Sequence, residues 1–320
     1  MKFRTEFKPR KSELTLNPHL PLVTLGSCFA DEISSRMRDC LWKAGNPAGV
    51  LFNPLSIAKA LELLLFTDNA DEAFSKTLFE TSGIYHSWMF DSSGSAKSGP
   101  EATNIFKNRK RELESMIDKG RTLCVTFGTS YCYFLSEYPD FVVANCHKQP
   151  AEMFIRRRIG IGGITEIWSS LITKLQIKYP GLQIIFTVSP VRHIRDGLHE
   201  NELSKATLLL AIDEICSTAG SCHYFPSYEI VNDDLRDYRF YAADLVHPSD
   251  MAVEYIWEIF KETYLDAKGL EFIKEGSSIV KRANHRPILA SKKQTEEFRR
   301  KTVRLYSDFQ LRHPDCLKLM

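Results

Sequence analysis

Short apolar runs that alternate with amphipathic helical patterns are the feature that most constrains how this chain folds. The apolar runs predict buried strands at residues 22–25, 123–127, 184–188 and 223–225. The helical spacing of apolar residues predicts helices at about 31–40, 53–65, 104–118, 200–218 and 249–264. Strands joined through helices run parallel, so we expect an α/β fold with a mostly parallel sheet.

Less regular stretches add further elements to this prediction. Asn53-Pro54 is expected to start a helix, with Asn53 as N-cap and Pro54 at the first helical position. The other elements predicted are a short strand at 41–44, a hairpin of strands at 131–135 and 141–144, and one or two helices over 150–178.

The chain is predicted to divide into two parts. Residues 1–270 carry the alternating strands and helices, with a polar surface insertion at about 67–100. Residues 271–320 change character and contain a charged helical pattern at about 291–311. We therefore expect one α/β domain with a helical C-terminal extension, which packs on that domain or on a partner and leaves oligomer formation open.

Composition and charge narrow the expected partners and location. The chain of 320 residues has a formal net charge of +2, which gives no reason to expect nucleic acid or a membrane surface as partner. The sequence contains no run of 18 consecutive apolar residues, so it predicts no membrane-spanning helix. The polar start of the chain does not resemble a secretory signal. The eight cysteines contain no CxxC pair. We therefore expect reduced thiols in a cytoplasmic protein, with no metal and no other cofactor.

A candidate nucleophile lies where the first predicted strand ends, in the stretch Gly26-Ser27-Cys28. Sites in open α/β sheets lie at the carboxyl ends of strands. Ser27 there has free backbone N–H groups beside it at a helix start, which can hold a developing oxyanion. Cys28 is a rival, because the helix dipole activates a thiol at that position. An ordinary turn of small residues is the third interpretation.

A serine nucleophile needs a base and a group that orients the base. Asp244 stands three residues before His247, just ahead of the last predicted helix of the domain. An Asp at this spacing can place its carboxylate beside Nδ1 of the imidazole and so fix the tautomer. Together with Ser27, the pair predicts a Ser-His-Asp triad in which His247 is the base.

Several blocks of the sequence resemble those of one known family. Gly26-Ser27-Cys28-Phe29-Ala30 spells the signature of the GSCFA family, a branch that resembles the SGNH, or GDSL-type, hydrolases. The resemblance covers about residues 20–265. It implies a flavodoxin-like three-layer α/β/α fold and acyl-ester chemistry, with Ser27 as nucleophile and Asp244 and His247 as its partners. The further blocks are Asn53-Pro54, Phe127-Gly128-Thr129, Asn145-Cys146-His147-Lys148, Val188-Ser189-Pro190, residues 235–240 and His247-Pro248-Ser249.

The oxyanion donors fit this resemblance less closely. It implies the backbone N–H groups of Ser27 and of a glycine after the second strand, which is Gly49 or its competitor Gly45. SGNH hydrolases usually add an asparagine from a GxND segment, but residues 128–130 read Gly-Thr-Ser. Asn145 is the candidate replacement, with a capping role as its alternative. A hydroxyl group within 128–130 is the other candidate.

Four polar residues near strand ends are candidates for substrate binding: Thr129, His147, Arg192 and His193. His147 equally fits a backbone-bonding role at the start of the helix predicted after the hairpin. Arg192 and His193 follow a strand and could bind an acidic or sugar substrate, or pair with nearby acids such as Asp196.

These observations lead to an expected function. We expect a serine esterase that hydrolyses acyl esters, O-acetyl esters in particular, on a carbohydrate or other small molecule. The substrate class is implied by the resemblance alone. Two alternatives stay open: an acyltransferase that uses the same triad with a sugar hydroxyl in place of water, and a non-catalytic binding module on the same fold.

Overall fold

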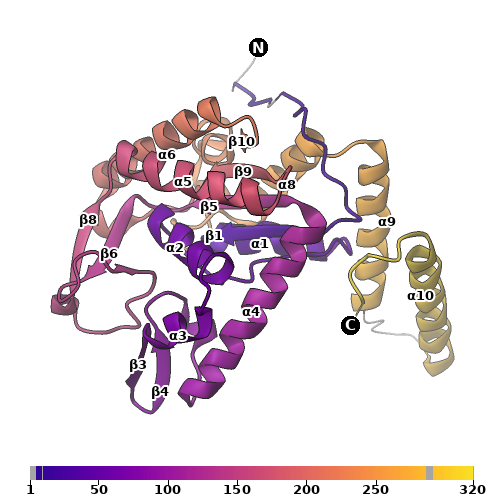
Figure 1. Cartoon of the computed structure of the whole chain (residues 1–320). Helices are drawn as coiled ribbons and strands as arrows, with labels where there is room; N and C mark the ends of the chain where they lie inside the picture. The colour runs from indigo at the N-terminus through magenta and orange to yellow at the C-terminus, as the bar shows by residue number, and fades with distance from the viewer. Residues whose placement is uncertain (1–4, 9, 286–290, 320) are drawn as a thin grey trace.

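The computed structural model describes residues 5–8, 10–285 and 291–319, and its centre is a five-stranded sheet of order β10-β9-β5-β1-β2 (Figure 1). Every neighbouring pair in this sheet runs parallel. Counted along the chain, the strand order is the flavodoxin-like one, which confirms the predicted fold. The strands are β1 (Leu22–Gly26), β2 (Ala44–Gly45), β5 (Thr122–Phe127), β9 (Gln183–Val188) and β10 (Cys222–Tyr224).

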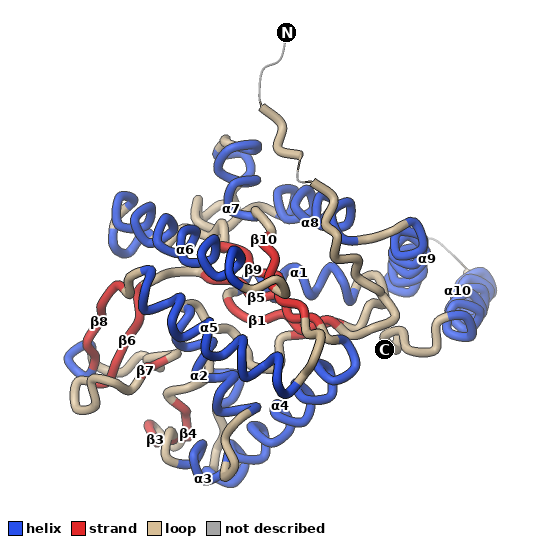
Figure 2. The backbone as a smooth tube through the Cα atoms, turned by 45° about the horizontal axis from the view of Figure 1, so that its top comes forward, coloured by secondary structure: helices blue, strands red, loops and turns tan. Residues whose placement is uncertain are grey.

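Helices cover both faces of the sheet and complete the three layers (Figure 2). Successive side chains of a strand point to opposite faces: Leu123 packs in one apolar cluster and its neighbour Cys124 in the other. The first cluster takes the buried faces of α2 (Pro54–Leu65), α4 (Gly99–Gly120), α5 (Ile161–Lys178) and α6 (Leu198–Thr218). The second takes those of α1 (Cys28–Arg38) and α8 (Asp250–Tyr264).

Local signals set the ends of two elements, one as predicted and one not. Asn53 Oδ1 accepts a hydrogen bond from Ser56 N at 2.8 Å, with Pro54 in the first turn of α2. The strand expected at 41–44 is shorter, since Leu41 has a φ of +62° and turns the chain before β2 begins at Ala44.

The predicted insertion at 67–100 has structure of its own. It contains α3 (Ala70–Ser75), a hairpin of β3 (Leu78–Thr81) and β4 (Ile84–Ser87), and the short helix η1 (Ser92–Gly94). Trp88, Met89 and Phe90 are buried. The segment therefore contributes to the core and is not confined to the surface.

The helix predicted from residue 150 is wrong at its start. After η2 (Ala151–Met153), the chain forms β8 (Phe154–Arg158), which pairs with β6 (Tyr131–Leu135) beside β7 (Val142–Val143). Arg156 lies 3.9 Å from the ring centroid of Tyr131 and Arg157 lies 4.0 Å from that of Phe134. These cross-strand cation–π contacts stabilise a strand whose sequence lacks apolar alternation.

The C-terminal extension is helical, as predicted, and consists of α9 (Ala267–Asn284) and α10 (Lys292–Arg312) (Figure 1). A Cβ on Gly276 would stand 2.1 Å from the carbonyl oxygen of Cys40, so α9 approaches the backbone just after α1. Phe309 of α10 packs on Phe272 of α9, with ring centroids 5.0 Å apart. Among the described helices, none is long and apolar enough to cross a membrane.

Candidate functional site

The order in which the chain adds strands to the sheet reverses at β1. The next strand in sequence, β2, lies on one side of β1, and the following strand of this sheet, β5, lies on the other side. Clefts in open α/β sheets form outside such a switch point. Gly26 makes the close approach possible: its φ is +123°, and a Cβ there would stand 2.1 Å from the carbonyl oxygen of Thr126 on β5. Ser27 and Gly128 therefore follow adjacent strand ends.

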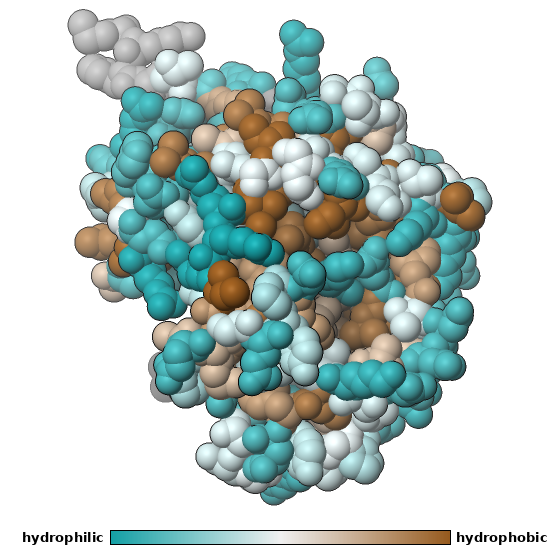
Figure 3. Space-filling view, turned by 60° about the vertical axis from the view of Figure 1, so that its left-hand side comes forward, coloured by the Kyte–Doolittle hydropathy of each residue, from teal (hydrophilic) through white to brown (hydrophobic). Residues whose placement is uncertain are grey.

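The side of the molecule where β6 and β8 follow β5 comes forward in Figure 3. Apolar side chains gather toward the centre of this face, and hydrophilic side chains lie around them.

Ser27 is the N-cap residue of α1, with φ −70° and ψ 173°, but its side chain makes no capping hydrogen bond. Its Oγ is buried and has no hydrogen-bond partner among the described residues. Leaving a buried hydroxyl unpaired costs about 1–3 kcal/mol. An unpaired hydroxyl at the switch point is therefore a candidate reactive group.

Asp244 and His247 form the pair predicted from their spacing. His247 Nδ1 lies 2.6 Å from Asp244 Oδ2, and Asp244 Oδ1 accepts hydrogen bonds from the N–H groups of Val246 at 2.9 Å and His247 at 3.0 Å. The two backbone N–H groups, followed by the imidazole, lower the pKa of Asp244 to about 2. The carboxylate is thus ionised at neutral pH. Both side chains are about half exposed, and Ser27 Oγ makes no hydrogen bond to this imidazole.

His193 lies beside Ser27. A Cβ built on Gly128 would stand 3.3 Å from His193 Nε2 and 3.6 Å from Ser27 Cβ. Burial, followed by the charge of Lys205, lowers the pKa of His193 to about 4, and the neighbouring His247 contributes in the same direction. His193 was predicted only as a substrate contact. The structure places its Nε2 near the candidate nucleophile, and His247 is close enough to affect its pKa.

Lys205 is a buried residue that the sequence interpretation missed. Its Nζ donates to the carbonyl oxygens of Gly128 and Ser189, both at 2.6 Å, and so ties together the loops after β5 and β9. Burial lowers the pKa of this ammonium to about 7. A signal was present in the sequence, because Lys205 falls on the stripe of α6 that also buries Leu208 and Ile212, at helical spacing.

The two hydroxyls after Gly128 are held on the side of α6. Ser204 Oγ lies 3.1 Å from Thr129 Oγ1, and it accepts from Ser130 N at 2.8 Å and from Ser130 Oγ at 3.1 Å. Thr129 Oγ1 also accepts from Tyr131 N. These contacts explain both side chains as structural, and substrate binding by Thr129 stays a prediction.

Gly49 and Asn145, the other predicted oxyanion donors, take part in turns. The N–H of Gly49 donates to Asn46 O at 3.1 Å, and Asn145 Oδ1 accepts from His147 N at 2.8 Å. The bond at Asn145 closes a turn and is not a helix cap, because no helix begins at this point of the chain. That at Gly49 uses the donor that an oxyanion hole would need.

His147 and Arg192 are held by neighbouring groups. No helix begins at His147: its φ is +47°, and its Nε2 lies 2.9 Å from Ser87 O and 3.1 Å from Phe90 O. Arg192 stacks 4.1 Å from the ring centroid of Tyr241. The expected pairing with Asp196 is made instead by Arg156, at 2.5 Å.

Cys28, the rival nucleophile, lacks the properties of a reactive thiol. Burial raises the pKa of this thiol. The backbone N–H of Phe29 acts in the opposite direction, and the nearby acid Asp31 adds a smaller upward effect. The thiolate is the nucleophilic form of cysteine. A thiol held protonated at neutral pH is a weak candidate beside Ser27.

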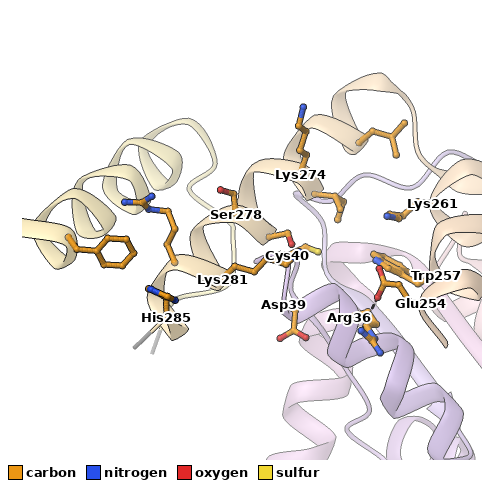
Figure 4. A pocket seen from close by; sticks show the side chains of 15 residues that line it. Arg36, Asp39, Cys40, Glu254, Trp257, Lys261, Lys274, Ser278, Lys281 and His285 are labelled. Atoms are coloured by element: carbon orange, nitrogen blue, oxygen red, sulfur yellow. Dashed lines mark hydrogen bonds and ion pairs between the residues drawn. The ribbon is translucent and has the colours of Figure 1, made fainter. Parts of the chain in front are cut away.

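A groove of about 720 Å³ lies elsewhere, between the end of α1 and the helices α8, α9 and α10 (Figure 4). Cys40, Trp257 and Lys281 are among its lining residues. Ser27 stands at the opposite end of α1. This groove therefore does not serve the candidate site.

Comparison with known proteins supports the motif assignment. No curated protein matches the chain. The model of the GSCFA family matches residues 21–260, the segment that contains the sheet, Ser27 and the Asp244–His247 pair. With three quarters of its length matched, the chain belongs to the GSCFA family.

Proposed function

We propose that this protein is a serine hydrolase of acyl esters, with Ser27 as nucleophile, His247 as general base and Asp244 as the group that orients the base. The observation that carries the proposal is the buried, unpaired Oγ of Ser27 at the switch point. The second support is the pair of His247 and Asp244. Because the Asp244 carboxylate lies 2.6 Å from His247 Nδ1, Nε2 of that imidazole is left as the proton acceptor.

The reaction would follow acyl-transfer chemistry. Ser27 Oγ attacks the ester carbonyl while its proton passes to His247 Nε2, and the carbonyl oxygen becomes an oxyanion. Collapse of this intermediate breaks the bond to the alcohol, which leaves with the proton from His247. Water then releases the acid from the acyl-serine by the same steps. Productive geometry requires His247 Nε2 to come within about 2.6–3.2 Å of Ser27 Oγ when substrate binds.

A carbohydrate ester suits the surroundings of the site. Arg192, next to His193, lies over the rings of Tyr241 and Tyr238, and Tyr238 is 59% exposed. Exposed aromatic rings present an apolar face with a polar tip, and such surfaces can stack against sugar rings. We therefore propose O-acetyl sugars as the first substrates to test.

The test is covalent labelling with a fluorophosphonate, which phosphonylates activated serines and releases fluoride. We expect the wild-type protein to label and Ser27→Ala to label at background. Cys28→Ala is the matched control, and it should label at the wild-type rate. Equal labelling of wild type and Ser27→Ala, or none of the wild type, would reject the proposal and favour a non-catalytic module.

A further inference from the structure

We propose that His193 is a catalytic residue whose Nε2–H donates a hydrogen bond to the oxyanion formed when Ser27 attacks the ester. This inference rests on the proposed function and deepens it. It assigns a donor where the usual asparagine is replaced by Gly128-Thr129-Ser130 and where those hydroxyls bond Ser204 instead.

Geometry is the first support. His193 Nε2 and Ser27 Cβ lie within 3.3 and 3.6 Å of the point where a Cβ on Gly128 would stand. Residue 128 has no side chain to separate them. Nε2 is the atom of His193 nearest to this point, so the edge of the imidazole that can donate a hydrogen bond faces the Ser27 side.

The imidazole is also held in place. The backbone N–H of His193 donates to Asn201 Oδ1 at 2.9 Å, and its ring meets that of Phe52 edge to face at 6.2 Å. Lys205 fixes the two loops on either side through its bonds to Gly128 O and Ser189 O. An oxyanion donor is effective only when its position is fixed before reaction.

The surrounding charges favour a donor over a base. Burial and the charges of Lys205 on α6, Arg156 on β8 and His247 lower the pKa of His193, and only Asp196 acts in the opposite direction. The imidazole is therefore neutral at pH 7 and resists protonation. The same positive groups favour a negative charge beside it. A neutral histidine that polarises a carbonyl through its N–H is an established catalytic device.

The experiment compares two variants of similar size, His193→Gln, which keeps an N–H donor, and His193→Met, which does not. The probe is p-nitrophenyl acetate, with fluorophosphonate labelling of Ser27 in parallel. We expect His193→Met to have a kcat about 10²–10³-fold lower than the wild type with little change in KM, as when other oxyanion donors are removed. His193→Gln should retain at least about ten times more activity than His193→Met. The acid limb of its pH profile should be unchanged, because His247 remains the base.

Three results would overturn the inference. One is equal activity of His193→Gln and His193→Met. Another is a wild-type rate in His193→Met. The third is a shift of the acid limb of the pH profile in His193→Gln, which would make His193 the base. If circular dichroism shows that His193→Met does not fold, His193→Ala replaces it as the donor-free variant. Failure of the proposed function is separate, because it would show as wild-type protein in which Ser27 does not react.

Discussion

Lys205→Met is the perturbation that most directly tests the electrostatics of the site. Lys205 is fully buried and donates to two carbonyl oxygens at the ends of β5 and β9. Methionine has similar length but neither charge nor donor. The substitution therefore removes the titrating group while it keeps most of the packing.

The expected effect follows from the pKa of this lysine, about 7 in the folded protein against an ordinary 10.5. Between these values the unfolded chain binds more protons than the folded one, so the free energy of unfolding rises with pH. Where the two states differ by one bound proton, the free energy of unfolding changes by about 1.4 kcal/mol for each pH unit. From pH 7 to pH 9, the wild-type protein should gain about 2 kcal/mol relative to Lys205→Met. Below about pH 6 the lysine is charged in both states, so its own titration no longer changes the difference.

The assay is urea denaturation at pH 6, 7, 8 and 9, followed by the fluorescence of buried tryptophans such as Trp168. Lys119→Met, an exposed site on α4, is the matched control and should follow the wild-type curve. Burial raises the pKa of Cys124 to about 12, which lowers stability at high pH, but this contribution cancels in the difference between variants. A wild-type minus Lys205→Met difference that does not change with pH would refute the reasoning.

Three other substitutions probe the site and the fold. Gly128→Ala would place a Cβ 2.9 Å from Phe52 O, so we expect a loss of about 1–3 kcal/mol in stability and at least tenfold slower fluorophosphonate labelling; unchanged labelling would contradict the close packing. Asp244→Asn should slow labelling about 10²–10⁴-fold with an unchanged melting temperature, and a wild-type rate would remove the carboxylate from the mechanism. Gly276→Ala meets Cys40 O at 2.1 Å and should lower the melting temperature by several degrees without affecting labelling; an unchanged melting temperature would show that α9 can move away from α1 at no cost.

Features encoded within a few residues could be predicted from the sequence. The start of α2 follows from Asn53-Pro54, and the contact of Asp244 with His247 follows from their three-residue spacing. Apolar runs predicted β1, β5 and β9, because strands buried on both faces need continuous apolar residues. Signals of this kind require no knowledge of the rest of the chain.

Features that depend on distant partners could not be predicted in the same way. Arg156 and Arg157 form part of a strand because Tyr131 and Phe134 lie on the paired strand β6. Nothing local marks them as strand residues. The contribution of the insertion to the core was missed for the same reason, since Trp88 packs on the distant Phe154, with ring centroids 5.7 Å apart.

The candidate site also depends on contacts between residues that are distant in sequence. Gly128, His193 and Lys205 stand far apart in the sequence. The ammonium of Lys205 nevertheless fixes the loop of Gly128 and, after burial, contributes to the lowered pKa of His193. A buried cation whose hydrogen bonds go to two carbonyl oxygens, with no salt bridge to a carboxylate among the described residues, is costly in a resting protein. Its cost is offset when negative charge develops nearby, as it does on an oxyanion. The buried position of Lys205 at this end of the sheet therefore agrees with the proposed reaction, in which a transient anion forms close by.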